Sequence, residues 1–164
     1  MKAETQTIIH PFSPIFDQNS EILILGTLPS VKSRENAFYY GHPQNRFWRV
    51  IAELCRASVP ETTAEKTALL LENHIALWDV VYSCEIAGSS DSSIRNVVPT
   101  DLNRVLSQSM IKRVFANGGK AAQLYRRYQQ SITGIEITAL PSTSPANARW
   151  SLEQLCNAWR DAIM

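Results

Sequence analysis

The segment Glu21-Ile-Leu-Ile-Leu-Gly26 contains a short, continuous apolar run, which begins after the polar Glu21 and ends at Gly26. Runs of this length and composition are typical of a strand that is buried on both faces of a parallel sheet. Similar segments follow later in the chain, and we expect further strands at residues 75–81, 112–116 and 134–140. The sequence therefore predicts a four-stranded parallel sheet.

Segments with helical character lie between these strands. Residues 46–56 carry apolar side chains at helical spacing, and residues 62–65 form a capping box that opens a helix ending at residue 71. Further helices are expected at residues 101–107, at 117–128, and after the cap at 151–154. Alternation of strands and helices predicts a three-layer α/β/α fold with helices on both faces of the sheet.

Two segments lack such patterns. The first 20 residues contain prolines and polar breaks, so we expect an irregular N-terminal arm, and the polar residues 85–99 should form a long loop. The chain has 164 residues, of which 45% are hydrophobic and 19% are charged. This composition suits a single domain spanning residues 1–164, with a core of its own.

Composition also limits the function classes. The formal net charge is only +1, so a nucleic-acid partner must be held by a local basic patch. The three cysteines, Cys55, Cys84 and Cys156, are far apart without a CxxC pair, so we expect reduced thiols and no metal site. No apolar stretch approaches the roughly 20 residues of a membrane span. We expect a soluble, cytoplasmic protein without a membrane partner.

Residues 26–30, 79–84, 117–120 and 141–147 lie where the carboxyl ends of the strands should meet, which is where open parallel sheets bind ligands. The first of these is Gly26-Thr-Leu-Pro-Ser30, whose glycine lets backbone approach a ligand closely. An ordinary strand-to-loop turn is the alternative. The segment is neither GxGxxG nor a P-loop, which argues against a dinucleotide or nucleoside triphosphate and leaves no cofactor expected.

Phe38-Tyr-Tyr-Gly-His-Pro-Gln-Asn-Arg-Phe-Trp48 is dense in aromatic and polar residues. Aromatic faces stack on bases and amides read base edges, which favours a nucleic-acid site. Phe47 and Trp48 are better explained as core residues. In the loop Pro141-Ser-Thr-Ser-Pro-Ala-Asn147, hydroxyl and N–H groups could bind phosphate oxygens, and a structural turn is equally consistent.

These motifs resemble a known family. Gly26-Thr-Leu-Pro-Ser30 and Pro141-Ser-Thr-Ser-Pro-Ala-Asn147 resemble the two signature motifs of the uracil-DNA glycosylase superfamily. His42-Pro-Gln-Asn-Arg-Phe-Trp48 is similar to a segment of the mismatch-specific uracil/thymine glycosylases. With Tyr39-Tyr-Gly41 and Leu77-Trp-Asp-Val80 included, the set most resembles the hypoxanthine (deoxyinosine) DNA glycosylase branch over residues 22–160.

One position departs from the superfamily. Many members carry a catalytic Asn or Asp two residues after the glycine of the first motif, where this chain has Leu28. The hypoxanthine branch also lacks that residue, and the resemblance implies that Asn45 replaces it. The iron–sulfur branch is excluded because its cysteine ligands have no counterpart here.

The resemblance implies site residues for flipping a damaged base out of the stack and hydrolysing its N-glycosidic bond. Asn45 is the expected catalytic residue, Tyr40 the ring that stacks on the base, and His42 either a pocket residue or a structural cap. The expected base pocket comprises Gly26, Thr27, Leu28, Pro29, Tyr40, His42 and Asp79, with the N–H groups near Thr27 and Leu28 facing the departing base. The expected DNA-binding residues are Ser30, Arg46, Lys120, Ser142, Thr143, Ser144, Asn147 and Arg149.

Asp79 suggests how the base is chosen. A carboxylate only accepts hydrogen bonds, and hypoxanthine presents an N1–H donor where adenine presents a bare acceptor. Asp79 would then admit deaminated adenine and reject adenine, although a cap of the local turn is an equally consistent role.

The expected function is a monomeric, metal-free DNA glycosylase that removes deaminated bases from double- or single-stranded DNA. Hypoxanthine is the first choice of base, followed by uracil. The alternatives are a G:U or G:T mismatch glycosylase, a hydrolase of free nucleosides, and a DNA-damage binder without activity, the last because of Leu28.

Overall fold

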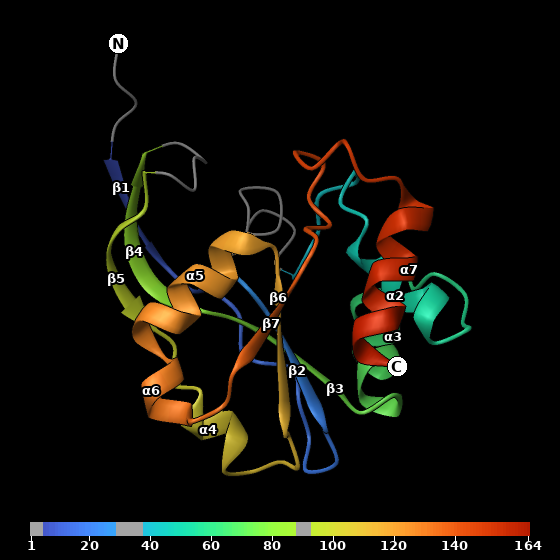
Figure 1. Cartoon of the computed structure of the whole chain (residues 1–164), viewed down its shortest axis with the longest axis horizontal. Coiled ribbons are helices and arrows are strands. Elements are labelled where there is room, and N and C mark those ends of the chain that lie inside the picture. Colours follow the sequence, from blue (N-terminus) through green and yellow to red (C-terminus); the bar gives the residue numbers. More distant parts are fainter. Residues whose placement is uncertain (1–4, 29–37, 88–92) are drawn as a thin grey trace.

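The computed structural model describes residues 5–28, 38–87 and 93–164. Its main sheet contains four parallel strands in the order β3-β2-β6-β7 (Figure 1). The strands are β2 (Ile22–Gly26), β3 (Ile75–Asp79), β6 (Arg113–Asn117) and β7 (Ile137–Leu140). Every residue of β2 and β3 is buried, which explains their unbroken apolar sequences. The predicted parallel sheet is confirmed.

Helices cover both faces of this sheet (Figure 1). On one side lie α2 (Phe47–Leu54), α3 (Thr63–Glu72) and α7 (Leu152–Ile163). On the other lie α4 (Asn103–Leu106), α5 (Gly119–Tyr128) and α6 (Gln130–Thr133). This is the predicted three-layer α/β/α fold. The capping box that opens the last helix is present, with Ser151 accepting from the N–H of Gln154.

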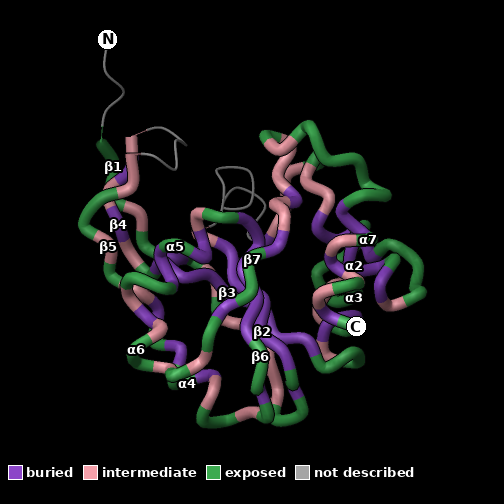
Figure 2. Tube along the Cα trace, viewed as in Figure 1, coloured by how far each residue is buried: buried purple, intermediate pink, exposed green. Residues whose placement is uncertain are grey.

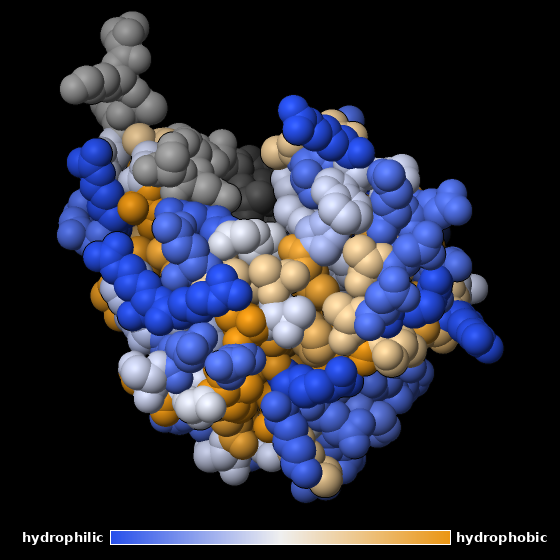
Figure 3. Space-filling view, in the orientation of Figure 1, coloured by the Kyte–Doolittle hydropathy of each residue, from blue (hydrophilic) through white to orange (hydrophobic). Residues whose placement is uncertain are grey.

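The apolar core runs along the sheet and into the α2–α7 side. Figure 2 shows the strands of the main sheet as mostly buried, with exposed residues concentrated in the outer helices and loops. Trp159 of α7 and Phe47 of α2 are fully buried and meet edge to face, with ring centroids 6.0 Å apart. Figure 3 shows hydrophilic residues over much of one face, with an apolar band between them. No described helix is both long and apolar enough to span a membrane.

A second sheet, which the sequence analysis did not predict, corrects two expectations. β1 (Thr5–Ile9), β4 (Val81–Ala87) and β5 (Arg95–Pro99) form an antiparallel sheet in the order β1-β4-β5. Residues 5–9 are therefore not an irregular arm, and much of 85–99 is not loop. The side chains of β1 are largely exposed, so backbone pairing with β4 rather than an apolar pattern holds it in place.

The order of the strands fixes where a ligand can bind. β2 pairs with both β3 and β6, so the chain winds to one side of β2 and then to the other. Open parallel sheets bind ligands at the carboxyl ends of the strands beside such a switch point. Gly26, Asp79, Asn117 and Leu140 are the last residues of the four strands and lie along this edge.

Candidate active site

Gly26 brings two polar groups together at the end of β2. A Cβ atom added to Gly26 would lie 2.4 Å from Asp79 Oδ1 and 2.7 Å from the Tyr40 hydroxyl. Both distances are too short for any side chain at this position. The glycine is therefore required because it leaves room for a carboxylate and a phenol beside the backbone.

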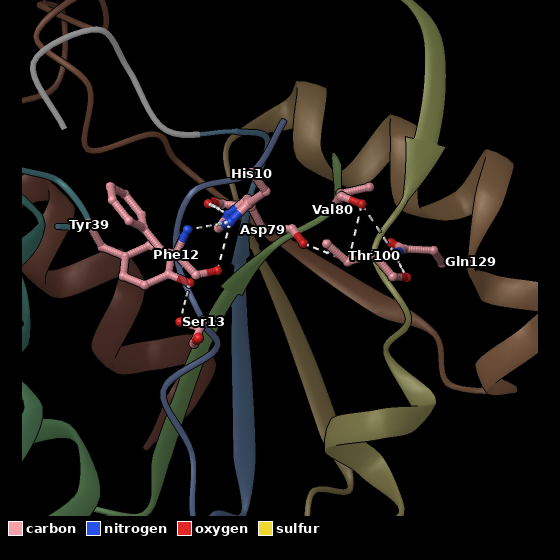
Figure 4. Close-up of polar contacts among 8 residues, drawn as sticks. All are labelled: His10, Phe12, Ser13, Tyr39, Asp79, Val80, Thr100 and Gln129. Atoms are coloured by element: carbon pink, nitrogen blue, oxygen red, sulfur yellow. Dashed lines mark hydrogen bonds and ion pairs between the residues drawn. The ribbon is translucent and has the colours of Figure 1, made fainter. Parts of the chain in front are cut away.

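His10 holds the Asp79 carboxylate from the far side. His10 Nε2 donates to Asp79 Oδ2 at 2.7 Å, and both side chains are buried (Figure 4). His10 follows β1, and its own N–H donates to the carbonyl of Tyr82 in β4 at 2.7 Å. The small sheet thus contributes a residue to the site. This role could not be predicted from sequence, because His10 is a single histidine in a segment without an apolar pattern.

The backbone of Asp79 is fixed independently of its carboxylate. The Thr100 hydroxyl donates to the Asp79 carbonyl at 2.7 Å, and Gln129 Nε2 donates to the Thr100 carbonyl at 2.9 Å (Figure 4). Within the described residues, the Asp79 carboxylate accepts no backbone N–H. The structural alternative for Asp79, a turn cap, therefore has no support in this geometry.

Tyr40 places its ring against the core and its hydroxyl at the site. The ring stacks on Phe47 with centroids 4.1 Å apart and planes at 23°. Burial, and then the nearby Asp79 carboxylate, raise the pKa of Tyr40 well above its usual range. The phenol therefore stays neutral, and its buried hydroxyl forms no hydrogen bond to any described residue. Such a group can serve a ligand as donor or acceptor.

Asn45 is held in one orientation. Its Oδ1 accepts from the N–H of Phe47 and from the hydroxyl of Thr143, each at 2.9 Å. A backbone N–H can only donate, so the atom that faces it must be the oxygen. The Nδ2 group consequently points away from these partners, and it has no hydrogen-bond partner in the described part of the chain.

Asn117, which the sequence analysis did not assign to the site, supports this arrangement. Its Oδ1 accepts from the Thr143 N–H at 3.0 Å, and its Nδ2 donates to the Thr143 hydroxyl at 2.9 Å. The available signal was a polar residue closing an apolar strand directly before Gly118-Gly119. Thr143 itself differs from the prediction. It is fully buried with its hydroxyl engaged, so it does not face a DNA phosphate.

Arg46 also has a different role from the predicted phosphate contact. Its guanidinium donates to the carbonyls of Ser144 and Asn147, each at 3.0 Å, and to that of Trp150. Asn147 Nδ2 donates to the Ser142 carbonyl at 2.9 Å, so this side chain also supports the loop. A single arginine therefore ties residues 144–150 to the start of α2.

The remaining predicted residues have varied positions. His42 Nδ1 accepts the N–H of Gln44 at 3.0 Å, which fits the structural alternative. Ser142 Oγ accepts from the Ser144 N–H at 3.1 Å. Thr27, Leu28, Lys120 and Ser144 are partly exposed and Arg149 is exposed, whereas Pro29 and Ser30 lie outside the described residues. No three His, Cys, Asp or Glu side chains in the described ranges gather as metal ligands would.

The crowding around Gly26 makes a direct prediction. Gly26→Ala should lower base excision about tenfold, because the new Cβ displaces Asp79 Oδ1 or the Tyr40 hydroxyl, and misplaced site groups lose much of their effect. Gly119→Ala is the matched control, since its Cβ would meet nothing within 4 Å. Rates are compared below the melting temperature of each variant. Equal rates in the two variants would show that the site does not depend on this crowding.

Comparisons with known proteins point to one family. The family model described as the uracil DNA glycosylase superfamily matches residues 13–163. A hypoxanthine DNA glycosylase of Methanosarcina acetivorans is 36% identical over 141 residues, 85% of this chain and 89% of that protein. A hypoxanthine DNA glycosylase of Methanosarcina barkeri is 33% identical over 154 residues, 93% of this chain and 96% of that protein.

A solved structure supports the same assignment. A solution NMR structure from Methanosarcina acetivorans, provisionally described as a uracil DNA glycosylase, has a TM-score of 0.79 and 32% identity to this chain. The similarity covers 95% of this chain and 98% of that one. The resemblance found in the sequence motifs is confirmed, and the chain belongs to the uracil DNA glycosylase superfamily.

Proposed function

We propose that this protein is a monofunctional DNA glycosylase that hydrolyses the N-glycosidic bond of deaminated bases, hypoxanthine first and uracil second. Family membership and the names of the two Methanosarcina relatives support this activity. The observation that carries the proposal is the meeting of the Tyr40 hydroxyl and the Asp79 carboxylate beside Gly26. A neutral phenol and a carboxylate together offer a donor and an acceptor to the edge of a base.

The base must leave the DNA stack to reach these groups. One face of Tyr40 is already stacked on Phe47, and we propose that its other face receives the flipped base. Aromatic stacking of this kind contributes roughly 1–3 kcal/mol per base. A preformed two-ring stack holds the base in place while its sugar reacts.

Bond cleavage leaves negative charge on the base and positive charge on the sugar. We propose that the N–H groups of Thr27 and Leu28 stabilise the departing base, together with Nδ2 of Asn45. Among the described residues, none of these donors has a hydrogen-bond partner. Fixed donors directed at developing charge are the usual source of large rate effects in enzymes.

Asp79 would choose the base. Its Oδ2 is occupied by His10, so Oδ1 is the atom that we assign to the N1–H of hypoxanthine or the N3–H of uracil. Adenine would place a bare nitrogen opposite this oxygen, at a cost of roughly 1–3 kcal/mol. Shape alone would have to exclude guanine, which also carries N1–H.

Contacts to the DNA backbone are proposed for Ser30, Lys120, Ser142, Ser144 and Arg149. The last four follow the carboxyl ends of β6 and β7 in the chain, and hydroxyl and cationic groups are common phosphate ligands. No metal or other cofactor is required in this scheme. We further propose that the protein acts as a monomer on cellular DNA in the cytoplasm.

Salt should weaken binding in spite of the small net charge. We expect the affinity of Asn45→Ala for a hypoxanthine duplex to fall at least about tenfold between roughly 50 and 200 mM salt, because phosphate contacts release counterions. Arg149→Gln should make the slope of log affinity against log salt concentration shallower by about 1, the contribution of one phosphate contact. Arg104→Gln is the control, since α4 lies at the other end of the molecule (Figure 1). Salt-independent affinity would argue against a DNA substrate.

One assay distinguishes the candidate functions. Labelled duplexes, each with one hypoxanthine, uracil or mismatched thymine, are incubated with the protein, and abasic sites are then cleaved by alkali. Strand breaks at hypoxanthine are the expected result. Breaks only at uracil or thymine opposite guanine would indicate a mismatch glycosylase. Binding of lesion DNA without strand breaks would indicate a damage binder. Hydrolysis of free inosine without any strand breaks would indicate a nucleoside hydrolase.

A further inference from the structure

The Asn45 amide lies at the end of a buried hydrogen-bond chain whose every donor and acceptor is determined. The Thr143 N–H can only donate, so Asn117 must face it with Oδ1, at 3.0 Å. Asn117 Nδ2 then donates to the Thr143 hydroxyl at 2.9 Å. The single hydroxyl proton of Thr143 is therefore free to go to Asn45 Oδ1, also at 2.9 Å.

We propose that Thr143 and Asn117 are positioning residues that select one of the two flip states of the Asn45 amide. The selected state directs Oδ1 into the protein and leaves Nδ2 as the group available to a ligand. This inference rests on the proposed function, and it assigns the site a donor rather than an acceptor at Asn45.

The opposite flip is disfavoured on both sides of the amide. Turning Asn45 by 180° would place its NH₂ group against the Phe47 N–H and the Thr143 hydroxyl. At present the amide oxygen accepts a hydrogen bond from each of these two groups. The hydroxyl could accept from both amides only by leaving its own proton without an acceptor, since the Asn117 amide is fixed in its donor orientation by the Thr143 N–H. Thr143 is 0% exposed, so water cannot replace the missing partner.

This chain of hydrogen bonds also joins two separate parts of the fold. Asn117 ends β6 and Thr143 lies in the loop after β7, whereas Asn45 precedes α2. The Arg46 N–H donates to the Thr143 carbonyl at 3.1 Å, which fixes the same junction a second time. Orientation of the amide therefore depends on Thr143 as well as on the Phe47 N–H, and Thr143 is the residue that connects Asn45 to Asn117.

Thr143→Val tests the proposal, because it removes the hydroxyl and keeps a branched side chain. We expect the single-turnover excision rate to fall about tenfold, the worth of roughly 1.4 kcal/mol, with little change in the affinity for lesion DNA. Thr143→Ser restores the hydroxyl and should recover most of the rate. Thr133→Val is the matched control, since it removes a hydroxyl bonded to the Tyr125 hydroxyl at 2.6 Å, away from the strand ends.

A double-mutant cycle and a spectroscopic readout complete the test. In an Asn45→Ala background, Thr143→Val should have no further effect on the rate. In wild-type protein, the side-chain amide NMR signals of Asn45, assigned by their loss in Asn45→Ala, should shift in Thr143→Val and not in Thr133→Val. Additive rate losses, or unshifted amide signals, would overturn the positioning role. Absence of excision by wild-type protein with the amide shifts intact would overturn the proposed function alone.

Discussion

Replacing Asn45 with alanine is expected to lower the single-turnover excision rate by about 10²-fold or more, the usual effect of losing one preorganised polar group. The side chain is anchored through Oδ1 to Phe47 and Thr143, which leaves Nδ2 for the substrate. Loss of the bond to the Phe47 N–H should cost about 1 kcal/mol of folding stability, as for other caps near a helix start. Rapid-quench excision on a hypoxanthine duplex measures the rate, and thermal unfolding measures the stability.

Asn45→Asp separates the two chemical roles that an asparagine could have. The aspartate keeps an oxygen for Phe47 and Thr143, so the fold is unchanged, but it replaces the Nδ2 donor with an acceptor. We expect it to be as inactive as Asn45→Ala. A near-normal or faster rate would instead show that an acceptor, which could activate water, is what the site requires at this position.

Replacing Asp79 with asparagine is expected to narrow the discrimination between hypoxanthine and adenine by about tenfold, from the roughly 1–3 kcal/mol of an unpaired buried group. The amide can still accept from His10 Nε2 with its oxygen, and its NH₂ group then faces the position of the base. This group suits the bare nitrogen of adenine and opposes the N1–H of hypoxanthine. Excision of the preferred base should therefore fall as excision of adenine becomes detectable.

The measurement is a ratio of excision rates on matched duplexes with hypoxanthine or adenine at one position. Asp101→Asn is the control for loss of a nearby negative charge, since Asp101 is exposed and follows Thr100. If Asp79→Asn melts at a lower temperature but keeps the wild-type ratio, Asp79 serves only to bind His10.

The buried parts of the fold were predictable because buried strands have a local composition that is apolar throughout. β2 and β3 are apolar throughout, since both faces of these strands are covered. β1 lacks such a signal because its side chains are largely exposed, and its order comes from pairing with β4. A local sequence pattern does not reveal that a strand pairs with another strand far away in the chain, as β1 does with β4.

The site was predictable only in part, for a similar reason. Gly26, Tyr40, Asn45 and Asp79 belong to motifs with unusual local composition. His10 acquires its position from a partner 69 residues away, which no local pattern reveals. Thr143 lies in a predicted loop of hydroxyl residues, and only the packed structure distinguishes the buried hydroxyl from its exposed neighbours.

The bond from His10 to Asp79 also links the site to an exposed edge strand of the small sheet. β1 pairs with β4 alone among the described strands, and most of its side chains face solvent. Segments of this kind open locally with a free energy well below that of global unfolding. Each such opening removes His10 and leaves the Asp79 carboxylate buried without its partner. We therefore expect fraying of β1 to lower the fraction of competent molecules, so that on heating excision activity falls before the main sheet melts.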